Sequence, residues 1–371
     1  MRDDPDHAIL RQIRPDDILG CVDVFYDAVD PLYRRLDQPL PPRDPASLGR
    51  LIGHLLDYDA DRAWLAEAPS ATGDDRPPRI LGFGTAWQRE STWYLALLFV
   101  RPHAQAGGLG RKLLLRTFPR GPLDLPDADG RAAGAWEAAG GTAGGAEPAG
   151  HGTADLGTGA GTSGGGTSGT TGGAGGPGSG LMATCVDSIQ PISTGLYAGY
   201  GIVPRVPLFT AIGRPRPGSL PALPRDVVAT GFEALPATYP LAGTLAALDR
   251  ATLGFERPQD HRFWAHEGRR GVLFRRAGAG DAVGYGYAQP SGRLGPVALL
   301  DETLYPAVLG TLISRESPPG PYLALVPGVN HRAMVALLHA GLRFEGFPGI
   351  VGSTRPWEGL ARYLPASYAL P

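Results

Sequence analysis

A long glycine-rich tract divides the chain and limits which residues can build a folded core. From Pro122 to Gly180 the sequence is mostly Gly, Ala, Thr and Ser, with almost no large apolar side chains. Such a tract cannot bury enough apolar surface to offset the entropy lost on ordering. It is also far longer than a phosphate-binding glycine loop, which joins a strand directly to a helix. We therefore predict a disordered insertion, 122–180, inside a domain built from the residues on both sides.

The composition indicates a two-domain protein of near-neutral charge. The chain has 371 residues and a net charge of −2, which argues against a general polyanion binder, so no nucleic-acid partner is expected. Its two cysteines, Cys21 and Cys185, have neither disulfide nor metal-site spacing. The N-terminus is unlike a signal peptide, and no apolar run reaches the roughly 18 residues of a membrane span. We expect a cytoplasmic location without a membrane partner, as a monomer or homodimer.

The residues before 215 predict alternating strands and helices. Strands are expected at 7–13, 62–67, 80–89, 92–100, 181–186 and 206–212, and helices at 18–28 (with Asp16 as N-cap), 45–58, 108–118 and 192–200. The strand at 92–100, TWYLALLFV, is apolar enough for the centre of a sheet. This half therefore predicts an α/β domain over 1–214.

The residues after 224 repeat this order less clearly. Helices are expected at 240–253, 302–314 and 331–340, and strands at 271–275, 282–289, 294–299, 322–326 and 349–354. The segments LYAGYGIVPRVPLF and ALLHAGLRFEGFPG match each other, with Gly201 opposite Gly341. We predict a diverged tandem repeat, with a second domain at 225–371 and a stiff proline-rich linker at 215–224.

The stretch LFVRPHAQAGGLGRKLLL, which starts at Leu98, predicts an anion-binding helix start. A strand ends at Val100, and Q-x-x-G-x-G spacing at Gln105, Gly108 and Gly110 leads directly into a helix. The free N–H groups and the positive dipole end of such a helix suit a pyrophosphate, which glycines allow to approach closely. A dinucleotide-binding fold is disfavoured, because the turn is too long and no early βαβ unit surrounds it.

This stretch resembles motif A of the GNAT acetyltransferases, V-x-P-x-x-[QR]-x-x-G-x-[GA] after a central strand, and every position is filled. The resemblance implies two tandem GNAT-like domains, each with a central mixed sheet flanked by helices, and acetyl-CoA as the acyl donor. It also implies that the strand at 98–100 separates from the strand at 181–186, and that the gap binds pantetheine and stabilises an oxyanion. The cofactor-binding residues it implies here are Leu98, Phe99, Val100, Gln105, Ala106, Gly107, Gly108, Leu109, Gly110 and Arg111.

The helix after the insertion carries a second resemblance. The family pattern N-x-x-[AS]-x-x-x-Y is matched at Ser193 and Tyr197, while Gln190 replaces the Asn. The resemblance implies cofactor contacts for Gln190 and Ser193. It also implies that Tyr197 is the general acid that protonates the departing CoA thiolate. The alternative is a core tyrosine that packs this helix onto the sheet.

The general base stays open at this point. Glu90 precedes the central strand and Asp187 ends the strand after the insertion, and a chain of waters is a third possibility. Each carboxylate also has a structural interpretation, Glu90 as a solvated turn residue and Asp187 as a helix cap. Family resemblance further implies an acceptor pocket near the end of the first helix, at Asp30, Tyr33 and Arg34.

The second domain lacks the motif residues. Aligning Gly341 with Gly201 places Leu337 opposite Tyr197, and no Q-x-x-G-x-G follows the strand at 294–299. We predict that this domain binds no acetyl-CoA. His261 and His266 are five residues apart without a third ligand, so no metal is expected.

Acetyl transfer from acetyl-CoA to a primary amine of a small molecule is the leading functional prediction. The alternatives are an N-acetyltransferase acting on a protein or peptide and a non-catalytic acyl-CoA-binding sensor. The sequence does not identify the acceptor, because fold alone does not fix a substrate.

Overall fold

The computed structural model describes residues 7–40, 43–69, 79–119, 180–233, 241–278 and 280–371. The predicted insertion, apart from Gly180, and the loop at 70–78 fall outside these ranges. Residues on both sides of the insertion belong to one compact unit. We call the part before residue 215 the N-terminal half and the part after residue 224 the C-terminal half.

The N-terminal half contains the elements that the sequence predicts, with shifted ends. Its strands are β1 (Ile9–Gln12), β2 (Ala63–Glu67), β3 (Ile80–Arg89), β4 (Thr92–Val100), β5 (Leu181–Asp187) and β6 (Val203–Gly213). Its helices are α1 (Ile18–Arg35), α2 (Pro45–Asp59), α3 (Leu109–Thr117) and α4 (Pro191–Ala198). The predicted end of α1 at residue 28 is wrong, since the helix continues to Arg35 and includes Pro31. Asp16 is not its N-cap, because a short 3-10 turn at Pro15–Asp17 precedes it.

The C-terminal half repeats the order of elements but contains several that the sequence analysis missed. Its strands are β7 (Val227–Phe232), β8 (Arg270–Arg276), β9 (Ala282–Ala288), β10 (Arg293–Leu299), β11 (Tyr322–Pro327), β12 (Arg343–Ser353) and β13 (Tyr363–Leu364). Its helices are α5 (Ala242–Leu253), α6 (Pro258–His266), α7 (Tyr305–Ser314) and α8 (His331–Ala340). The missed elements are β7, α6 and β13, and β12 begins six residues before the predicted 349.

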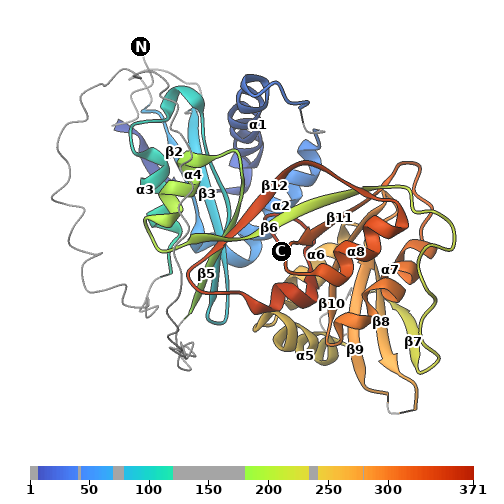
Figure 1. Cartoon of the computed structure of the whole chain (residues 1–371). Helices are drawn as coiled ribbons and strands as arrows, with labels where there is room; N and C mark the ends of the chain where they lie inside the picture. Colours follow the sequence, from blue (N-terminus) through green and yellow to red (C-terminus); the bar gives the residue numbers. More distant parts are fainter. Residues whose placement is uncertain (1–6, 41–42, 70–78, 120–179, 234–240, 279) are drawn as a thin grey trace, which may run out of the picture. The chain divides into compact units, whose positions relative to one another are not determined.

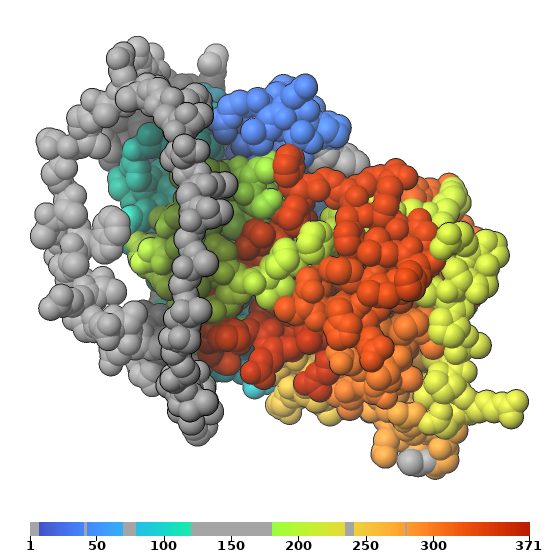
Figure 2. All heavy atoms as spheres, viewed as in Figure 1, coloured from blue at the N-terminus to red at the C-terminus, as the bar shows by residue number. Residues whose placement is uncertain are grey.

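The strands of both halves form one mixed sheet, and the halves exchange their last strands. The order among the described strands is β1-β2-β3-β4-β5-β12-β6-β11-β10-β9-β8-β7, with β13 added on β10. Thus β12 lies between β5 and β6, as Figure 1 shows, and β6 in turn pairs with β11. In Figure 2 the green residues of the N-terminal half and the red residues of the chain end meet on one face. Each half is therefore completed by a strand of the other.

Helices cover both faces of the sheet in the N-terminal half, and the alternation of side chains separates the two faces. On one face Phe25 of α1 packs edge-on against Phe99, with ring centroids 4.7 Å apart. On the other face Gly82 and Gly84 of β3 leave room for α3, because a Cβ at Gly82 would come within 3.2 Å of Leu113. The close packing that these glycines allow positions the start of α3 at the end of β4.

Buried charges also connect the two halves. The Asp59 carboxylate of α2 accepts a hydrogen bond from Arg89 at 2.9 Å, and Arg89 also lies 3.4 Å from Asp260 of α6. Asp260 pairs further with His54 at 2.9 Å and with Arg257 at 3.0 Å. The Arg257 and Arg89 guanidinium groups hold the pKa of Asp260 far below its usual range despite burial. Because both halves contribute charges, separating them would leave buried ions without partners.

Candidate active site

The loop between β4 and α3 presents a row of backbone N–H groups. Ala106 and Gly108 both have left-handed backbone angles, with φ of 74° and 70°. A left-handed alanine is an uncommon, strained conformation, so the loop has an unusual shape at this point. Within the described part of the chain, no hydrogen bond is donated by the backbone N–H of any residue from 106 to 111. These groups and the helix dipole form an anion-binding site.

Other predicted residues of this loop hold it in place through hydrogen bonds and packing. The Gln105 side-chain amide donates to the Val100 carbonyl oxygen at 2.9 Å, which closes the loop onto the end of β4. Leu109 is buried in the core, so only its backbone faces the site. Arg111 donates from Nε to the Tyr200 hydroxyl at 2.9 Å and so links α3 to the end of α4. Gln105 and Leu109 therefore position the loop through packing and hydrogen bonding, whereas the glycines leave space above it.

Next to this loop, β4 and β5 separate. Their parallel pairing extends from Thr92–Leu181 to Leu95–Thr184 and ends there, although β4 continues to Val100 and β5 to Asp187. A bulge begins at the same point, because Thr85 pairs with Leu97 but Ala86 pairs with Leu95, leaving Ala96 unmatched. We call the space between β4 from Ala96 and β5 from Cys185 the first opening. Among the described residues, the edge of β4 that carries Leu98, Phe99 and Val100 has no partner strand on the β5 side.

The two faces of the first opening carry different chemistry. Helix α4 lies on the face of α3, because Phe118 contacts both Trp93 and Tyr200 edge-on, at 5.3 and 5.2 Å. Cys185 lies on the opposite face, since its Sγ would be 2.8 Å from a Cβ at Gly349, beside the Tyr368 ring. Asp187, two residues later in β5, shares that opposite face. Tyr197 and Asp187 therefore approach the first opening from opposite sides.

Tyr197 lies in the last turn of α4. Its side chain is buried, and Ser193 lies one helical turn earlier in α4. Since helical side chains point toward the N-terminus, the hydroxyl is directed to the end of β5. Burial raises the pKa of the phenol, and the Ser193 side chain opposes this only in part. The group therefore keeps its proton at neutral pH, as a proton donor must.

Asp187 is a partly buried carboxylate at the end of β5. Burial raises its pKa above the ordinary 3.8, and in the part of the chain that the structure describes no basic side chain counters that shift. Its charge also contributes, after burial, to the raised pKa of Tyr33 at the end of α1. A carboxylate with a raised pKa at the edge of an opening is well suited to accept a proton.

Several predicted residues lie apart from this arrangement. Glu90 sits in the β3–β4 turn, at the end of β4 that is remote from Val100, where it accepts a hydrogen bond from the Glu256 backbone at 3.1 Å. Residues Thr92–Leu95 of β4 separate Glu90 from the start of the first opening at Ala96, and a base at Glu90 stays a prediction. Asp30 is buried and paired with Arg43 and, at 3.6 Å, with Arg34. Gln190 precedes α4 without capping it through its side chain.

The C-terminal half has an equivalent opening, but its own chain fills it. Strands β10 and β11 are paired only at Arg293–Leu323 and Leu294–Ala324. β13 then pairs with β10 at Val297 and Ala298, and the Asn330 side chain donates to the Tyr363 carbonyl at 3.4 Å. The loop after β10 is capped by Asp301, whose carboxylate accepts from the Thr303 N–H at 3.0 Å. A carboxylate therefore stands where the N-terminal half offers free N–H groups.

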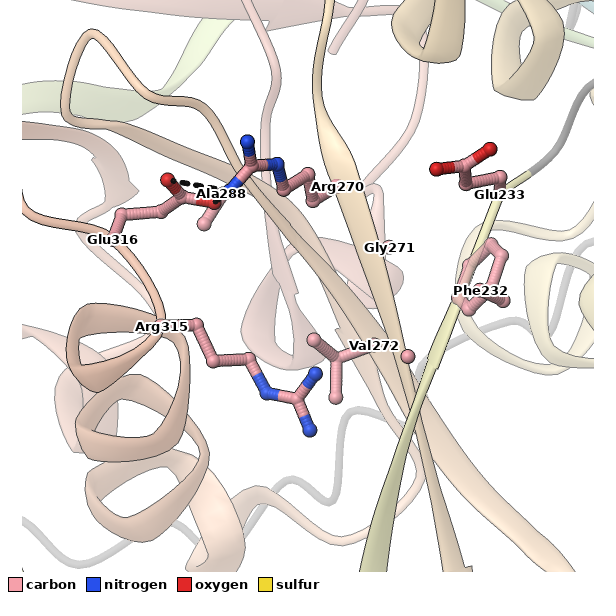
Figure 3. A pocket seen from close by; sticks show the side chains of 9 residues that line it. Phe232, Glu233, Arg270, Gly271, Val272, Ala288, Arg315 and Glu316 are labelled. Atoms are coloured by element: carbon pink, nitrogen blue, oxygen red, sulfur yellow. Dashed lines mark hydrogen bonds and ion pairs between the residues drawn. The ribbon is translucent and has the colours of Figure 1, made fainter.

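A cavity of about 470 Å³ also opens in the C-terminal half, away from the first opening. Figure 3 shows its walls, where the exposed Arg270 pairs with the buried carboxylate of Glu316 at 3.3 Å and Arg315 approaches Val272. The carboxylate is already neutralised by Arg270, and the cavity adjoins β7 and β8 rather than the separated strands. It therefore has no place in the chemistry of the first opening.

Comparison with known proteins identifies the fold. No protein-family model matches the sequence, and no curated protein matches it either. Among solved structures, a candidate acetyltransferase from Pyrococcus horikoshii superposes with a TM-score of 0.61 at 15% identity, over 98% of this chain and 96% of that one. A GCN5-related N-acetyltransferase from Sphaerobacter thermophilus superposes with a TM-score of 0.51 at 12% identity, over 95% and 98%. The chain therefore has the GNAT fold, which confirms the resemblance at the level of the fold.

Proposed function

We propose that this chain is an N-acyltransferase that moves an acetyl group from acetyl-CoA to a primary amine of a small molecule. The observation that carries the proposal is the first opening: it lies beside the free N–H groups of 106–111 and between a proton acceptor and a proton donor. The GNAT fold of the chain agrees with this reaction.

A cytoplasmic location remains a prediction. The structure adds only that no helix in its described part has the length and apolarity needed to cross a bilayer.

The donor would be held by backbone more than by side chains. The N–H groups of Ala106 to Arg111 would bind the pyrophosphate, since Cβ atoms at Gly108 and Gly110 would point into nearly open space. The free edge formed by Leu98, Phe99 and Val100 would pair with the pantetheine amides, much as a neighbouring strand would. Gln190 and Ser193, at the start of α4, would close the far side.

Proton transfers on the two faces would drive the reaction. Asp187 would take a proton from the amine, whose nitrogen then forms a bond to the thioester carbon. Backbone N–H groups freed by the bulge at Ala96 would stabilise the negative oxygen. As the carbon–sulfur bond breaks, Tyr197 would give its proton to the thiolate. The opposite positions of Asp187 and Tyr197 suit this sequence, because the incoming amine and departing thiol occupy opposite sides of the acyl carbon.

In this proposal the C-terminal half has no site for acetyl-CoA. We retain the domains 1–214 and 225–371 with the linker at 215–224, and propose that only the first binds acetyl-CoA. In the second, β13 and Asp301 stand where the pantetheine and the pyrophosphate would have to lie.

Release of CoA measured with a thiol reagent tests the proposal. Acetyl-CoA would be offered with a panel of small primary amines and lysine-containing peptides, beside a reaction without acceptor. We expect release that depends on a small amine and is lost in Tyr197→Phe. Preferential release with peptides would favour a protein acetyltransferase. Acetyl-CoA binding without transfer to any acceptor would indicate a sensor and overturn the enzymatic proposal.

A further inference from the structure

The chain segment from Tyr363 to Leu370 links the two openings through its backbone carbonyl groups. It begins as β13 in the opening of the C-terminal half. Arg269 and Arg293 then both donate to the Ala366 carbonyl at 3.3 Å. Farther along, Tyr94 donates to the Tyr368 carbonyl at 2.6 Å and Trp87 to the Ala369 carbonyl at 3.0 Å. The segment is thus fixed against both halves, and Tyr368 is held beside β4, next to the first opening.

The ring of Tyr368 lies on the face of the first opening that carries Asp187. Gly349 of β12 pairs with Asp187 of β5, and a Cβ at Gly349 would come within 3.2 Å of the Tyr368 ring. Burial, the neighbouring Cys185 and the Asp187 charge all raise the pKa of Tyr368. Tyr33 lies near the end of α1, the helix that covers this same face through Phe25 and Phe99. The Asp187 charge contributes, after burial, to the raised pKa of Tyr33. All three side chains are only partly buried, so a ligand can reach them.

We propose that Tyr33, Asp187 and Tyr368 form the acceptor site, and that it recognises a small primary ammonium group attached to an apolar carbon chain. The inference rests on the proposed function, whose acceptor it defines. Asp187 supplies the opposite charge, and the two phenol rings supply faces that attract a cation. Partial burial strengthens both interactions, since less water competes for the charge.

This site also gives the C-terminal half a role in the reaction. The opening between β10 and β11 is occupied by β13, which pairs with β10. From β13 the chain reaches the N-terminal half within five residues and delivers Tyr368 to Asp187. The C-terminal half therefore determines acceptor specificity, although the donor and both proton-transfer groups belong to the N-terminal half.

Binding of a probe cation tests the site without requiring turnover. Phenethylammonium and its neutral counterpart 2-phenylethanol would be titrated into the full chain by calorimetry at pH 7. We expect the ammonium ion to bind more tightly, and Tyr368→Leu to weaken it by about 2- to 30-fold, the range of one cation–π contact. Tyr368→Phe keeps the ring and should stay within about twofold of wild type. Asp187→Asn should remove the preference for the cation.

Matched controls separate recognition from general damage. Tyr322→Phe removes a phenol that hydrogen-bonds the Glu316 carbonyl far from the site, and Asp57→Asn removes an exposed carboxylate of α2. Both should leave the affinity for phenethylammonium unchanged. Equal binding of ammonium and alcohol by the wild type, or an unchanged ratio in Tyr368→Leu, would overturn the site. Melting curves identify any variant that has lost its fold. If Tyr368→Leu does not fold, Asp187→Asn still tests the site, because an unchanged preference for the ammonium ion in that variant would overturn it.

Kinetics distinguish failure of the site from failure of the proposed function. With the best amine of the panel, Tyr368→Leu should raise the acceptor KM by the same factor and leave the acetyl-CoA KM unchanged. Transfer with an unaltered acceptor KM would refute the acceptor site while the transferase function stands. Ammonium binding that depends on Tyr368 and Asp187, without transfer to any amine, would refute the function and retain a cation-binding site.

Discussion

The Thr184 hydroxyl donates to the Leu95 carbonyl at 3.0 Å, at the last position where β4 and β5 are paired. Beyond these two residues the strands diverge, so the bond lies at the apex of the first opening. Thr184 is only 2% exposed, which leaves water little access to replace it. This side-chain hydrogen bond therefore fixes the position at which the two strands begin to separate.

Thr184→Val should loosen this apex, because valine keeps the shape but donates no hydrogen bond. The buried Leu95 carbonyl would lose that partner, and the free energy of unfolding should fall by about 1–2 kcal/mol. Urea denaturation measures the loss, and calorimetry should show weaker acetyl-CoA binding. Thr311→Val is the control, since its hydroxyl bonds the Ala307 carbonyl within α7 and its loss should spare acetyl-CoA binding. Equal effects of both variants on that binding would contradict the assignment.

Gly108→Glu and Gly110→Glu should each abolish acetyl-CoA binding. A Cβ at Gly108 would meet nothing within 4 Å, and one at Gly110 only Val100 at 3.8 Å, so the added side chains enter the space proposed for the pyrophosphate. Their negative charge opposes the phosphates directly. The positive φ of Gly108 adds strain of about 1 kcal/mol for any other residue, so Gly110→Glu is the cleaner variant.

Gly243→Glu provides the comparison for both substitutions. It introduces the same side chain into α5, where a Cβ would also meet nothing within 4 Å. Calorimetry should show normal acetyl-CoA affinity for this control. Normal acetyl-CoA affinity in a folded Gly110→Glu protein would show that the pyrophosphate does not bind at this loop.

Local sequence patterns predicted the elements that position the donor site. The bounds of β4 agree with the prediction because an apolar run between two breaks defines a central strand well. The glycines of the loop and the match of Gly201 to Gly341 were also informative, since both glycines have positive φ and lie within three residues after a helix. Another repeat, LGFGTAW at Leu81 against VGYGYAQ at Val283, marks β3 and β9 and could have aligned the halves more firmly.

The sequence did not predict which strands pair with each other or which residues far apart in the chain come into contact. The exchange of β6 and β12 depends on which half each strand joins, and a strand's side-chain pattern does not specify its partner. β13 has two residues, too few for a period to show. Tyr368 is held next to the first opening because Tyr94 donates to its own carbonyl and Trp87 donates to that of Ala369, and both donors lie far away in sequence. For Glu90, closeness to a strand did not indicate which end of that strand borders the first opening.

Asp187→Asn should lower turnover by about 10²–10⁴-fold, the usual contribution of a general base, while Glu90→Gln leaves it unchanged. Burial raises the pKa of Asp187, so in the wild type the acidic limb of the pH–rate profile should lie above 3.8. Because the folded state holds this proton more tightly than the unfolded chain, the carboxyl favours folding at low pH, and that contribution disappears as pH rises through the raised pKa. Asp187→Asn should therefore be slightly more stable at pH 7, by thermal denaturation. A greater loss of turnover in Glu90→Gln would reverse the assignment.

Tyr197→Phe should reduce turnover by about 10²–10⁴-fold with little change in acetyl-CoA affinity. The buried ring remains, so packing survives, and only the hydroxyl is removed. Since burial raises the pKa of this phenol, a basic limb that reports it should lie above pH 10 and be altered in the variant. Ser193→Ala keeps the phenol and should have a much smaller effect. Near-normal turnover of Tyr197→Phe on its true amine would make the tyrosine a packing residue.

Calorimetric titration should give one acetyl-CoA per chain, although the fold contains two openings. In the C-terminal half β13 pairs with β10 at Val297 and Ala298, along the edge that pantetheine would need. Asp301, whose pKa is lowered mainly by its hydrogen bond with Thr303, adds a fixed negative charge at the place of the pyrophosphate. Steric and electrostatic exclusion thus act together. Asp301→Asn removes the charge but not β13, so it should still bind one equivalent. Two equivalent acetyl-CoA sites in the wild type would show that β13 separates from β10 to admit a second acetyl-CoA. A single site that persists in Gly110→Glu would show that acetyl-CoA binds in the C-terminal half.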